Sequence, residues 1–177
     1  MQNNQELSLE QINEIRQQGL RPVVVGCFIN DQKLLLVYKE EYGLWFLPQG
    51  GIKNKETISD AIKREMTEEL GSSFFSKADQ FYIFLDENIV KFPLQNRGNR
   101  DLFTDQAGKI FMKGKKYFFY IINTATQELN VSETEFNNYQ WVDFEQGKKL
   151  AEQIYQKGKK RITLDVLELL KNNNFIK

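Results

Sequence analysis

The sequence contains no histidine and only one cysteine in 177 residues. The missing histidine excludes imidazole as general base, nucleophile or metal ligand, so acid–base chemistry is left to carboxylates, lysines or tyrosines. Cys27 cannot form an internal disulfide, and it lies in an apolar run. We interpret it as a small buried hydrophobic residue rather than a reactive thiol.

Net charge is also missing, because 24 lysines and arginines balance 24 aspartates and glutamates. A balanced chain has no global field that draws it to nucleic acid, so such contact has to come from a local patch. No signal peptide or apolar stretch of membrane length is visible. We expect a cytoplasmic protein with no membrane and no obligate protein partner. The length and a hydrophobic content of 41% indicate one domain with a sizeable core.

The most informative segment is 50–72, GGIKNKETISDAIKREMTEELGS. It contains the pattern G-x5-E-x7-R-E-x-x-E-E-x-G, whose fixed residues are Gly50, Glu56, Arg64, Glu65, Glu68, Glu69 and Gly71. Thr57 with Asp60 resembles a capping box, and apolar residues follow at helical spacing. The segment therefore predicts a helix over 58–70 that ends at Gly71.

Three glutamates of this helix share one face, because Glu65 lies three residues before Glu68 and four before Glu69. Like charges at that spacing repel by roughly a few tenths of a kcal/mol per pair. A bound cation removes this cost, and hard oxygen ligands suit Mg²⁺ or Mn²⁺. The alternative, for glutamates taken without the rest of the pattern, is an ordinary solvated acidic face.

Taken whole, the pattern resembles the signature of the Nudix hydrolases, which cleave a nucleoside diphosphate linked to another group and use divalent metal ions. The resemblance implies an α/β protein, built as an α/β/α sandwich with a mixed β-sheet. It implies a metal site of Gly50 (through its carbonyl), Glu65, Glu68 and Glu69, with Glu56 and Arg64 bracing the loop against the helix. Ser72 stands where the family has an apolar residue, which bears on packing rather than on chemistry.

The rest of the chain alternates expected strands and helices. The expected helices outside the signature cover residues 8–18, 146–156 and 162–170. The expected strands cover 23–29, 33–38, 80–85, 109–123 and 139–144, with polar loops at 86–108 and 124–138. We expect residues 1–18 to form an N-terminal extension with a short helix, and residues 19–177 to form a single Nudix domain.

Further landmarks resemble one branch of the family, the bacterial RNA pyrophosphohydrolases and related dinucleoside polyphosphate hydrolases. They are Arg21-Pro22, Pro48-Gln49-Gly50-Gly51, Phe92-Pro93 before a basic loop, the segment MKGKKYF at 112–118, and Glu135-Phe136 with Trp141-Val142. The resemblance implies that Glu135 faces the signature helix as a further metal ligand or general base. Glu133 is a competing candidate for that role.

The candidate substrate-binding residues are Arg21, Lys39, Lys113, Lys115, Lys116 and Tyr117. The three lysines of the segment 112–118, together with Arg97 and Arg100, form either a basic rim that neutralises phosphate or a charged strand edge that resists aggregation. Tyr117 and Phe118 either stack on a base or belong to the core.

The residues and the resemblance together predict a metal-dependent pyrophosphohydrolase with four catalytic residues, Glu65, Glu68, Glu69 and Glu135. The expected substrate is a 5′-triphosphate end of RNA or a dinucleoside polyphosphate. One alternative is a hydrolase of small nucleotides, such as ADP-ribose or damaged nucleoside triphosphates. An alternative of another class is a non-catalytic nucleotide- or RNA-binding module, which lost signature glutamates would favour, but all of them are present.

Overall fold

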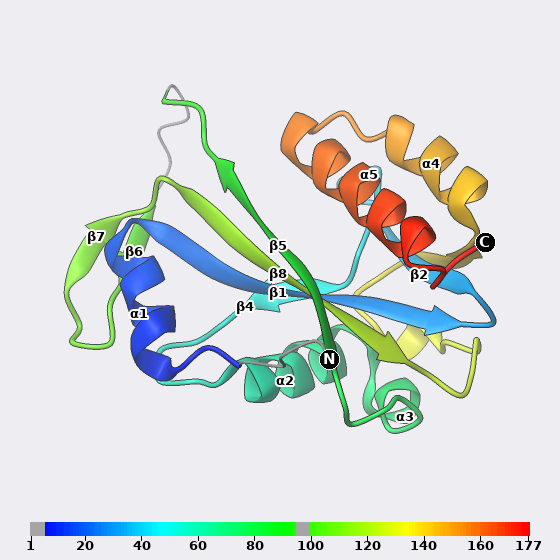
Figure 1. The fold of residues 1–177 in the computed structure, drawn as a ribbon, viewed down its shortest axis with the longest axis horizontal. Helices are drawn as coiled ribbons and strands as arrows, with labels where there is room; N and C mark the ends of the chain where they lie inside the picture. The colour runs from blue at the N-terminus through cyan, green and yellow to red at the C-terminus, as the bar shows by residue number, and fades with distance from the viewer. Residues whose placement is uncertain (1–5, 95–99) are drawn as a thin grey trace.

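The computed structural model describes residues 6–94 and 100–177, which form a sheet between helices (Figure 1). The strands of the main sheet are β1 (Leu20–Asn30), β2 (Lys33–Lys39), β3 (Leu44–Phe46), β4 (Gln49–Gly51), β5 (Ile83–Lys91), β8 (Gly114–Asn123) and β9 (Asn138–Val142). Their order is β3-β2-β1-β8-β5, while β4 also pairs with β1 and β9 pairs with β2. Because β1 and β8 run parallel and the other pairs antiparallel, the sheet is mixed, as expected.

Helices lie on both sides of this sheet (Figure 1). They are α1 (Leu9–Gln17), α2 (Ile58–Leu70), α3 (Ser72–Phe75), α4 (Phe144–Glu152) and α5 (Lys157–Asn172). Helix α2 lies so close to β1 that a Cβ added at Gly26 would come within 2.7 Å of the Met66 sulfur. Helices α4 and α5 pack against the opposite side, so the expected α/β/α sandwich is confirmed. Within the described ranges, no helix combines the length and apolar character that a membrane span requires.

Strand β1 is the buried centre of the sheet. The apolar side chains of residues 23–29 are at most 6% exposed, and Leu34, Leu35, Leu36 and Val37 of the neighbouring β2 are fully buried. Strands covered on both faces need a continuous apolar run rather than alternation. The two apolar runs of the sequence therefore form the buried central strands against which the helices pack.

The prediction of one long loop over 86–108 is wrong. Strand β5 continues to Lys91, and a separate two-stranded sheet forms from β6 (Asp101–Phe103) and β7 (Lys109–Phe111). β5 pairs antiparallel with β8 along its length, and the exposure of its second half alternates. Its polar residues 86–88 conceal the strand in the sequence, because an edge strand with one solvated face keeps only half of its apolar pattern.

The expected single strand over 109–123 is two strands, β7 and β8. The break falls at Met112 and Lys113, whose backbone N–H groups donate to the carbonyls of Arg100 and Gly19. These bonds tie the break to the hairpin and to the end of α1. The apolar run conceals the break because both halves are strands with similar composition.

The remaining elements are confirmed in kind, with shifted ends at the C-terminus. Asp143 caps α4, its side chain accepting from the Gln146 N–H at 2.8 Å, so the strand expected over 139–144 ends earlier and the helix expected over 146–156 begins earlier. Helix α5 begins at Lys157 rather than at 162. The sequence does not reveal this start, because the first turn of the helix is basic and lacks apolar spacing. Helix α1 is capped by Ser8 and Gln11 in a capping box.

Candidate active site

The expected helix over 58–70 is present as α2 with those bounds. Thr57 caps it by accepting a hydrogen bond from the Asp60 N–H at 3.1 Å. The buried face carries Ile58, Ala61, Ile62, Met66 and Leu70. Burial of this stripe fixes the rotation of the helix, and this rotation brings Glu65 and Glu69 to the glycine strand β4.

Glu65 lies directly against Gly50 of β4. A Cβ added at Gly50 would come within 1.9 Å of the Glu65 carboxyl carbon, so no other residue fits here without moving the glutamate. Gly50 is held in register by pairing with Val24 of β1. The glycine of the signature is therefore required for close approach of the helix carboxylate to the β4 backbone.

Arg64 braces the loop against the helix, as the resemblance implied. Its guanidinium donates to both carboxylate oxygens of Glu56 at 2.7 and 2.8 Å and to the Gly51 carbonyl at 2.9 Å. It also donates to Glu65 at 2.6 Å and lies 3.5 Å from Glu68. Burial alone would raise the pKa of Glu56, but hydrogen bonds from Arg64 and the Lys53 N–H outweigh it and hold that pKa below its usual value.

Glu69 is the most strongly perturbed carboxyl group of the site. Burial raises its pKa to about 8, with Glu65 and Glu135 adding to the rise, while the N–H of Gln49 and the charge of Lys39 oppose it. The Gln49 N–H donates to the Glu69 carboxylate at 2.8 Å. Glu69 therefore shares one electrostatic environment with Glu65 and Glu135.

The loop before β9 places Glu135, and not Glu133, beside these glutamates. The Glu135 N–H donates to the Glu69 carbonyl at 3.2 Å, and its carboxylate lies 3.8 Å from the Lys39 amino group. Glu133 instead accepts a short hydrogen bond from Ser73, beyond the end of α2. Lys39, predicted as a substrate contact, thus lies at the carboxylate group.

The residues present fit a divalent cation. Carboxylate and carbonyl oxygens are the donors that Mg²⁺ and Mn²⁺ prefer, and crowding of carboxyl groups around Glu69 is relieved by a cation. In residues 6–94 and 100–177, no three acidic, histidine or cysteine side chains are already arranged as a metal cage. Glu65 and Glu68 face the Arg64 guanidinium instead, and the Glu68 side chain is 54% exposed.

A large cleft opens on the α5 side of the sheet and is here called the basic cleft. Its volume is about 1080 Å³, and it is lined by Ile89, Val90, Lys91, Phe92, Pro93, Lys115, Tyr117, Gln156, Lys157, Gly158, Lys159 and Arg161. Five of these side chains are cationic and none is acidic. Burial lowers the pKa of Lys115 to about 8, with nearby Arg21 and Lys159 adding to the effect. The cleft is therefore a site where positive charges are crowded and favour an anion.

Arg21 lies between Lys115 of the basic cleft and the glycine strand. Arg21 pairs with Lys115 across β1 and β8, and a Cβ added at Gly51 would lie 2.5 Å from the Arg21 guanidinium. Gly50 thus faces Glu65 on one side of the sheet, while its neighbour Gly51 faces Arg21 on the other. Glu65 and Arg21 thus approach two adjacent glycines from opposite sides of the sheet.

The other predicted basic residues lie in several places. Lys116 points to the α2 side of the sheet and pairs with Glu87 at 2.7 Å, because alternate residues of a strand face opposite sides. Lys113 is exposed and lies against Gly19. Arg100 stacks 4.4 Å over the ring of Phe92 in the cleft wall, and Arg97 lies outside the described residues. Sequence reasoning missed Lys91, Lys157, Lys159 and Arg161, although the run KGKKR at 157–161 was a signal for three of them.

Of the two predicted aromatic residues, Tyr117 lines the basic cleft but is only 4% exposed, and its ring stacks on Phe119 at 6.3 Å. Phe118 is 1% exposed and belongs to the core. Tyr117 therefore forms part of the cleft wall, with its ring held by packing.

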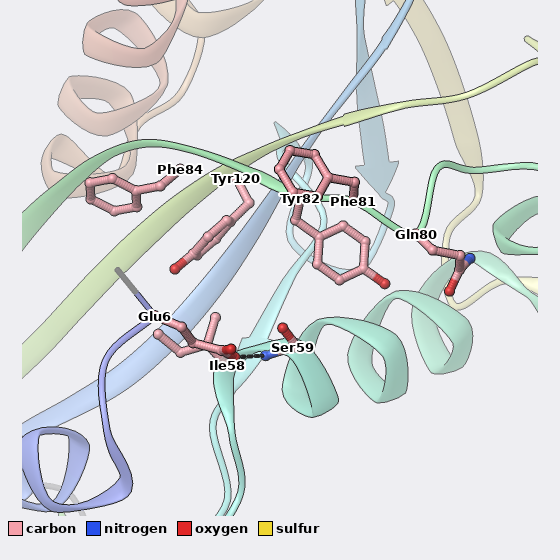
Figure 2. A pocket seen from close by; sticks show the side chains of 8 residues that line it. All are labelled: Glu6, Ile58, Ser59, Gln80, Phe81, Tyr82, Phe84 and Tyr120. Carbon is pink, nitrogen blue, oxygen red and sulfur yellow. Dashed lines mark hydrogen bonds between the residues drawn. The ribbon is translucent and has the colours of Figure 1, made fainter. Parts of the chain in front are cut away.

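A separate pocket of about 230 Å³ lies at the N-terminal end of α2 (Figure 2). Aromatic side chains make up half of its lining residues, and Glu6 accepts a hydrogen bond from the Ser59 N–H at 2.9 Å at its edge. Ser59 precedes Glu69 by ten residues, roughly 15 Å along the helix. The pocket contains no basic side chain, so it is distinct from both the acidic group and the basic cleft.

Comparison with known proteins agrees with this geometry. Residues 20–164 match the NUDIX domain family model. An RNA pyrophosphohydrolase of Pasteurella multocida (strain Pm70) is 26% identical over 166 residues, covering 88% of this chain and 79% of that protein. An RNA pyrophosphohydrolase of Saccharophagus degradans is 30% identical over 131 residues, covering 71% and 73%.

Among solved structures, the E. coli dihydroneopterin triphosphate pyrophosphohydrolase superposes with a TM-score of 0.58 at 11% identity, covering 84% of this chain and 97% of that one. That likeness concerns the fold. The family match covers most of the chain and contains the glycine strand, α2 and the loop of Glu135. The chain therefore belongs to the Nudix family and is a hydrolase of phosphoanhydride bonds.

Proposed function

We propose that the chain is a divalent-metal-dependent pyrophosphohydrolase that acts on nucleoside polyphosphates, with 5′-triphosphate ends of RNA or dinucleoside polyphosphates as the preferred substrates. The observation that carries the proposal is that Glu65 and Arg21 approach the adjacent Gly50 and Gly51 from opposite sides of the sheet. Carboxylates suited to a cation lie on one side, and a cleft with five cationic side chains opens on the other. The names of the relatives, RNA pyrophosphohydrolases, support the same substrate class.

In this proposal Glu65, Glu68 and Glu69 hold Mg²⁺ or Mn²⁺, with the Gly50 carbonyl and Glu135. A divalent ion at such a site supplies charge neutralisation and a bound water of lowered pKa. Glu135 or a helix glutamate accepts the proton of the attacking water. A P–O bond forms to the water oxygen and the anhydride P–O bond breaks. Cationic groups of the basic cleft stabilise the charge on the departing phosphate.

The size of the basic cleft supports a substrate larger than one nucleotide. Its volume of about 1080 Å³ is at or above the upper end of small-molecule sites, which run from roughly 300 to 1,000 Å³. Among its lining residues, Lys115 and Lys159 are half-buried and Lys91 and Arg161 are exposed, so a second phosphate group finds a cation. The ring of Phe92, with Arg100 stacked on it, offers an aromatic surface on which a nucleotide base of the substrate can stack.

The experiment is a substrate comparison with the whole chain in Mg²⁺ and in Mn²⁺. A 5′-triphosphate RNA, a dinucleoside tetraphosphate and ADP-ribose are supplied at equal concentration, and release of phosphate, pyrophosphate and nucleotide is measured. We expect the first two to be hydrolysed faster than ADP-ribose, and Glu68→Gln to be slower than wild type. Fastest cleavage of ADP-ribose would indicate a small-nucleotide enzyme. Tight nucleotide binding without metal-dependent hydrolysis would indicate a binding module.

A further inference from the structure

Helix α1 lies outside the segment that matches the family, yet it contacts the loop that leads into the catalytic helix. The match begins at Leu20, and α1 packs beside the β6–β7 hairpin and the start of β1 (Figure 1). Hydrogen bonds to this loop come from Arg16, which is only 2% exposed. A buried guanidinium is costly unless every part of it is paired, so its partners reveal what it does.

Arg16 binds the backbone of the loop directly after the two glycines. One of its terminal nitrogens donates to the carbonyl of Ile52 at 2.9 Å and to the carbonyl of Lys53 at 2.7 Å. The other donates to Asp105 at 3.3 Å. Two carbonyls and one carboxylate thus satisfy one planar fork, a geometry that arginine provides and lysine does not.

Asp105 holds the second half of the same loop. Its carboxylate accepts from the Asn54 side chain at 2.9 Å and from the Lys55 N–H at 3.3 Å. Lys55 has a φ of 59°, a left-handed conformation that a lysine rarely adopts unless its surroundings impose it. The Arg16–Asp105 pair therefore holds all four residues from 52 to 55.

Hydrogen bonds connect this loop to the carboxylates. The Lys53 N–H donates to Glu56 at 2.7 Å. Glu56 binds Arg64, which binds the Gly51 carbonyl and Glu65. Movement of the 52–55 loop would therefore change the position of Gly50 and the partner of Glu65 together.

We propose that Arg16 is a positioning residue for hydrolysis, which sets the Gly50–Glu56 loop through the carbonyls of Ile52 and Lys53 so that Gly50 and Glu65 present their oxygens to a divalent cation. Asp105 is its partner in this role, and α1 is the device that carries it. The inference rests on the proposed metal dependence. It assigns a function to a helix that the family match does not include.

The test compares Arg16→Lys with Ile12→Val in the full chain. Ile12 is a core residue of the same helix, 1% exposed, and its apolar side chain cannot form hydrogen bonds to the 52–55 loop, so this variant is a control for loss of core packing. Mn²⁺ affinity without substrate, kcat and KM on 5′-triphosphate RNA, and the melting temperature are measured. Residues that orient metal ligands typically contribute about 10- to 100-fold in metal affinity or activity. We expect Arg16→Lys to show a loss in that range in Mn²⁺ affinity and kcat, with KM within about twofold.

The control Ile12→Val should lower the melting temperature by a few degrees but keep wild-type Mn²⁺ affinity and kcat. If Arg16→Lys behaves in the same way, Arg16 only stabilises the fold and the proposal is wrong. Asp105→Asn should lose activity too, and its effect should not add to that of Arg16→Lys, because both variants break one network.

Amide hydrogen exchange separates this inference from the proposed function. The amides of residues 51–56 should exchange faster in Arg16→Lys than in Ile12→Val, with or without metal. A wild-type protein that neither binds Mn²⁺ nor hydrolyses any nucleotide would contradict the proposed function, while faster exchange would still show that Arg16 holds the loop. Equal exchange in both variants would overturn the inference, whatever the activity.

Discussion

The two sides of the site differ in how the chain builds them. The acidic side comes mostly from one contiguous segment, residues 50–71, in which a helix and its preceding loop fix the carboxylates. The basic cleft is assembled from three segments far apart in the sequence, at 89–93, 115–117 and 156–161. Local spacing therefore determines the groups suited to a cation, while tertiary packing determines the groups suited to the substrate. We therefore expect activity to fall sharply after a small substitution on the acidic side, and to fall only moderately after the loss of one cation from the basic cleft.

The largest effect is expected from Glu69→Gln on the acidic side. The Glu69 pKa of about 8 means that this group is mostly protonated at pH 7 without metal, so glutamine replaces it with little change in stability. A neutral amide is a poor ligand for Mg²⁺, and we expect kcat/KM to fall on the order of 1000-fold. Steady-state kinetics together with the melting temperature check this. Wild-type activity of Glu69→Gln would show that Glu69 is not a metal ligand or a catalytic residue.

Substitution of the adjacent glycines sharpens the comparison. Gly50→Ala forces the Glu65 carboxyl group away, and we expect a loss of about 100-fold, mainly in kcat. Gly51→Ala meets only the mobile end of Arg21, so we expect a loss of about tenfold, mainly as a rise in KM. Both variants are measured on 5′-triphosphate RNA at saturating Mg²⁺. Equal effects on kcat would show that the two glycines do not separate two functions.

A smaller effect is expected in the basic cleft. Lys159→Ala removes one cation from its lining, and KM for 5′-triphosphate RNA should rise about tenfold, with a weaker dependence on salt. Lys116→Ala is the matched control, because Lys116 faces the other side of the sheet and pairs with Glu87. Its KM should stay within about twofold of wild type. Titrations at two salt concentrations distinguish the variants. A larger rise in KM for Lys116→Ala than for Lys159→Ala would place the substrate on the α2 side of the sheet.

The smallest effect is a pH dependence of stability that comes from Lys115. Its pKa is lowered from 10.5 to about 8 in the folded protein, so between these values the unfolded chain binds more protons than the folded one. The free energy of unfolding therefore rises as the pH increases through that window, and the full destabilisation caused by burying Lys115 is present below pH 8. Lys115→Met should be more stable than wild type at pH 7 by on the order of 1 kcal/mol after solvent screening, with the difference shrinking toward pH 10. Urea unfolding at several pH values measures this, and a pH-independent difference would contradict it.

The central elements of the fold could be predicted because their signals are local. The bounds of α2 follow from Thr57, Gly71 and the apolar stripe between them, and β1 and β2 follow from two apolar runs. The second half of β5 was missed because the polar residues 86–88 interrupt its apolar pattern, and the start of α5 was missed because its first turn has no apolar spacing. In both places tertiary contacts decide the structure.

The acidic side of the site could be predicted for the same reason. The spacing of Glu65 and Glu69 on a helix is a property of the helix alone. That Glu135 lies beside them came from resemblance, and the structure gives it a physical basis in the bond to the Glu69 carbonyl. The basic run 157–161 was visible in the sequence, but its place beside Lys115 could not be assigned, because it depends on the packing of α5 against β5.

The burial of Cys27 at the centre of β1 has a practical consequence. Its side chain is fully buried, and burial raises the pKa of its thiol well above the ordinary value. An alkylating reagent can reach this sulfur only when the central strand separates from its neighbours. The rate at which Cys27 is alkylated therefore reports how often the core opens, and mass spectrometry can measure this rate in the wild-type protein.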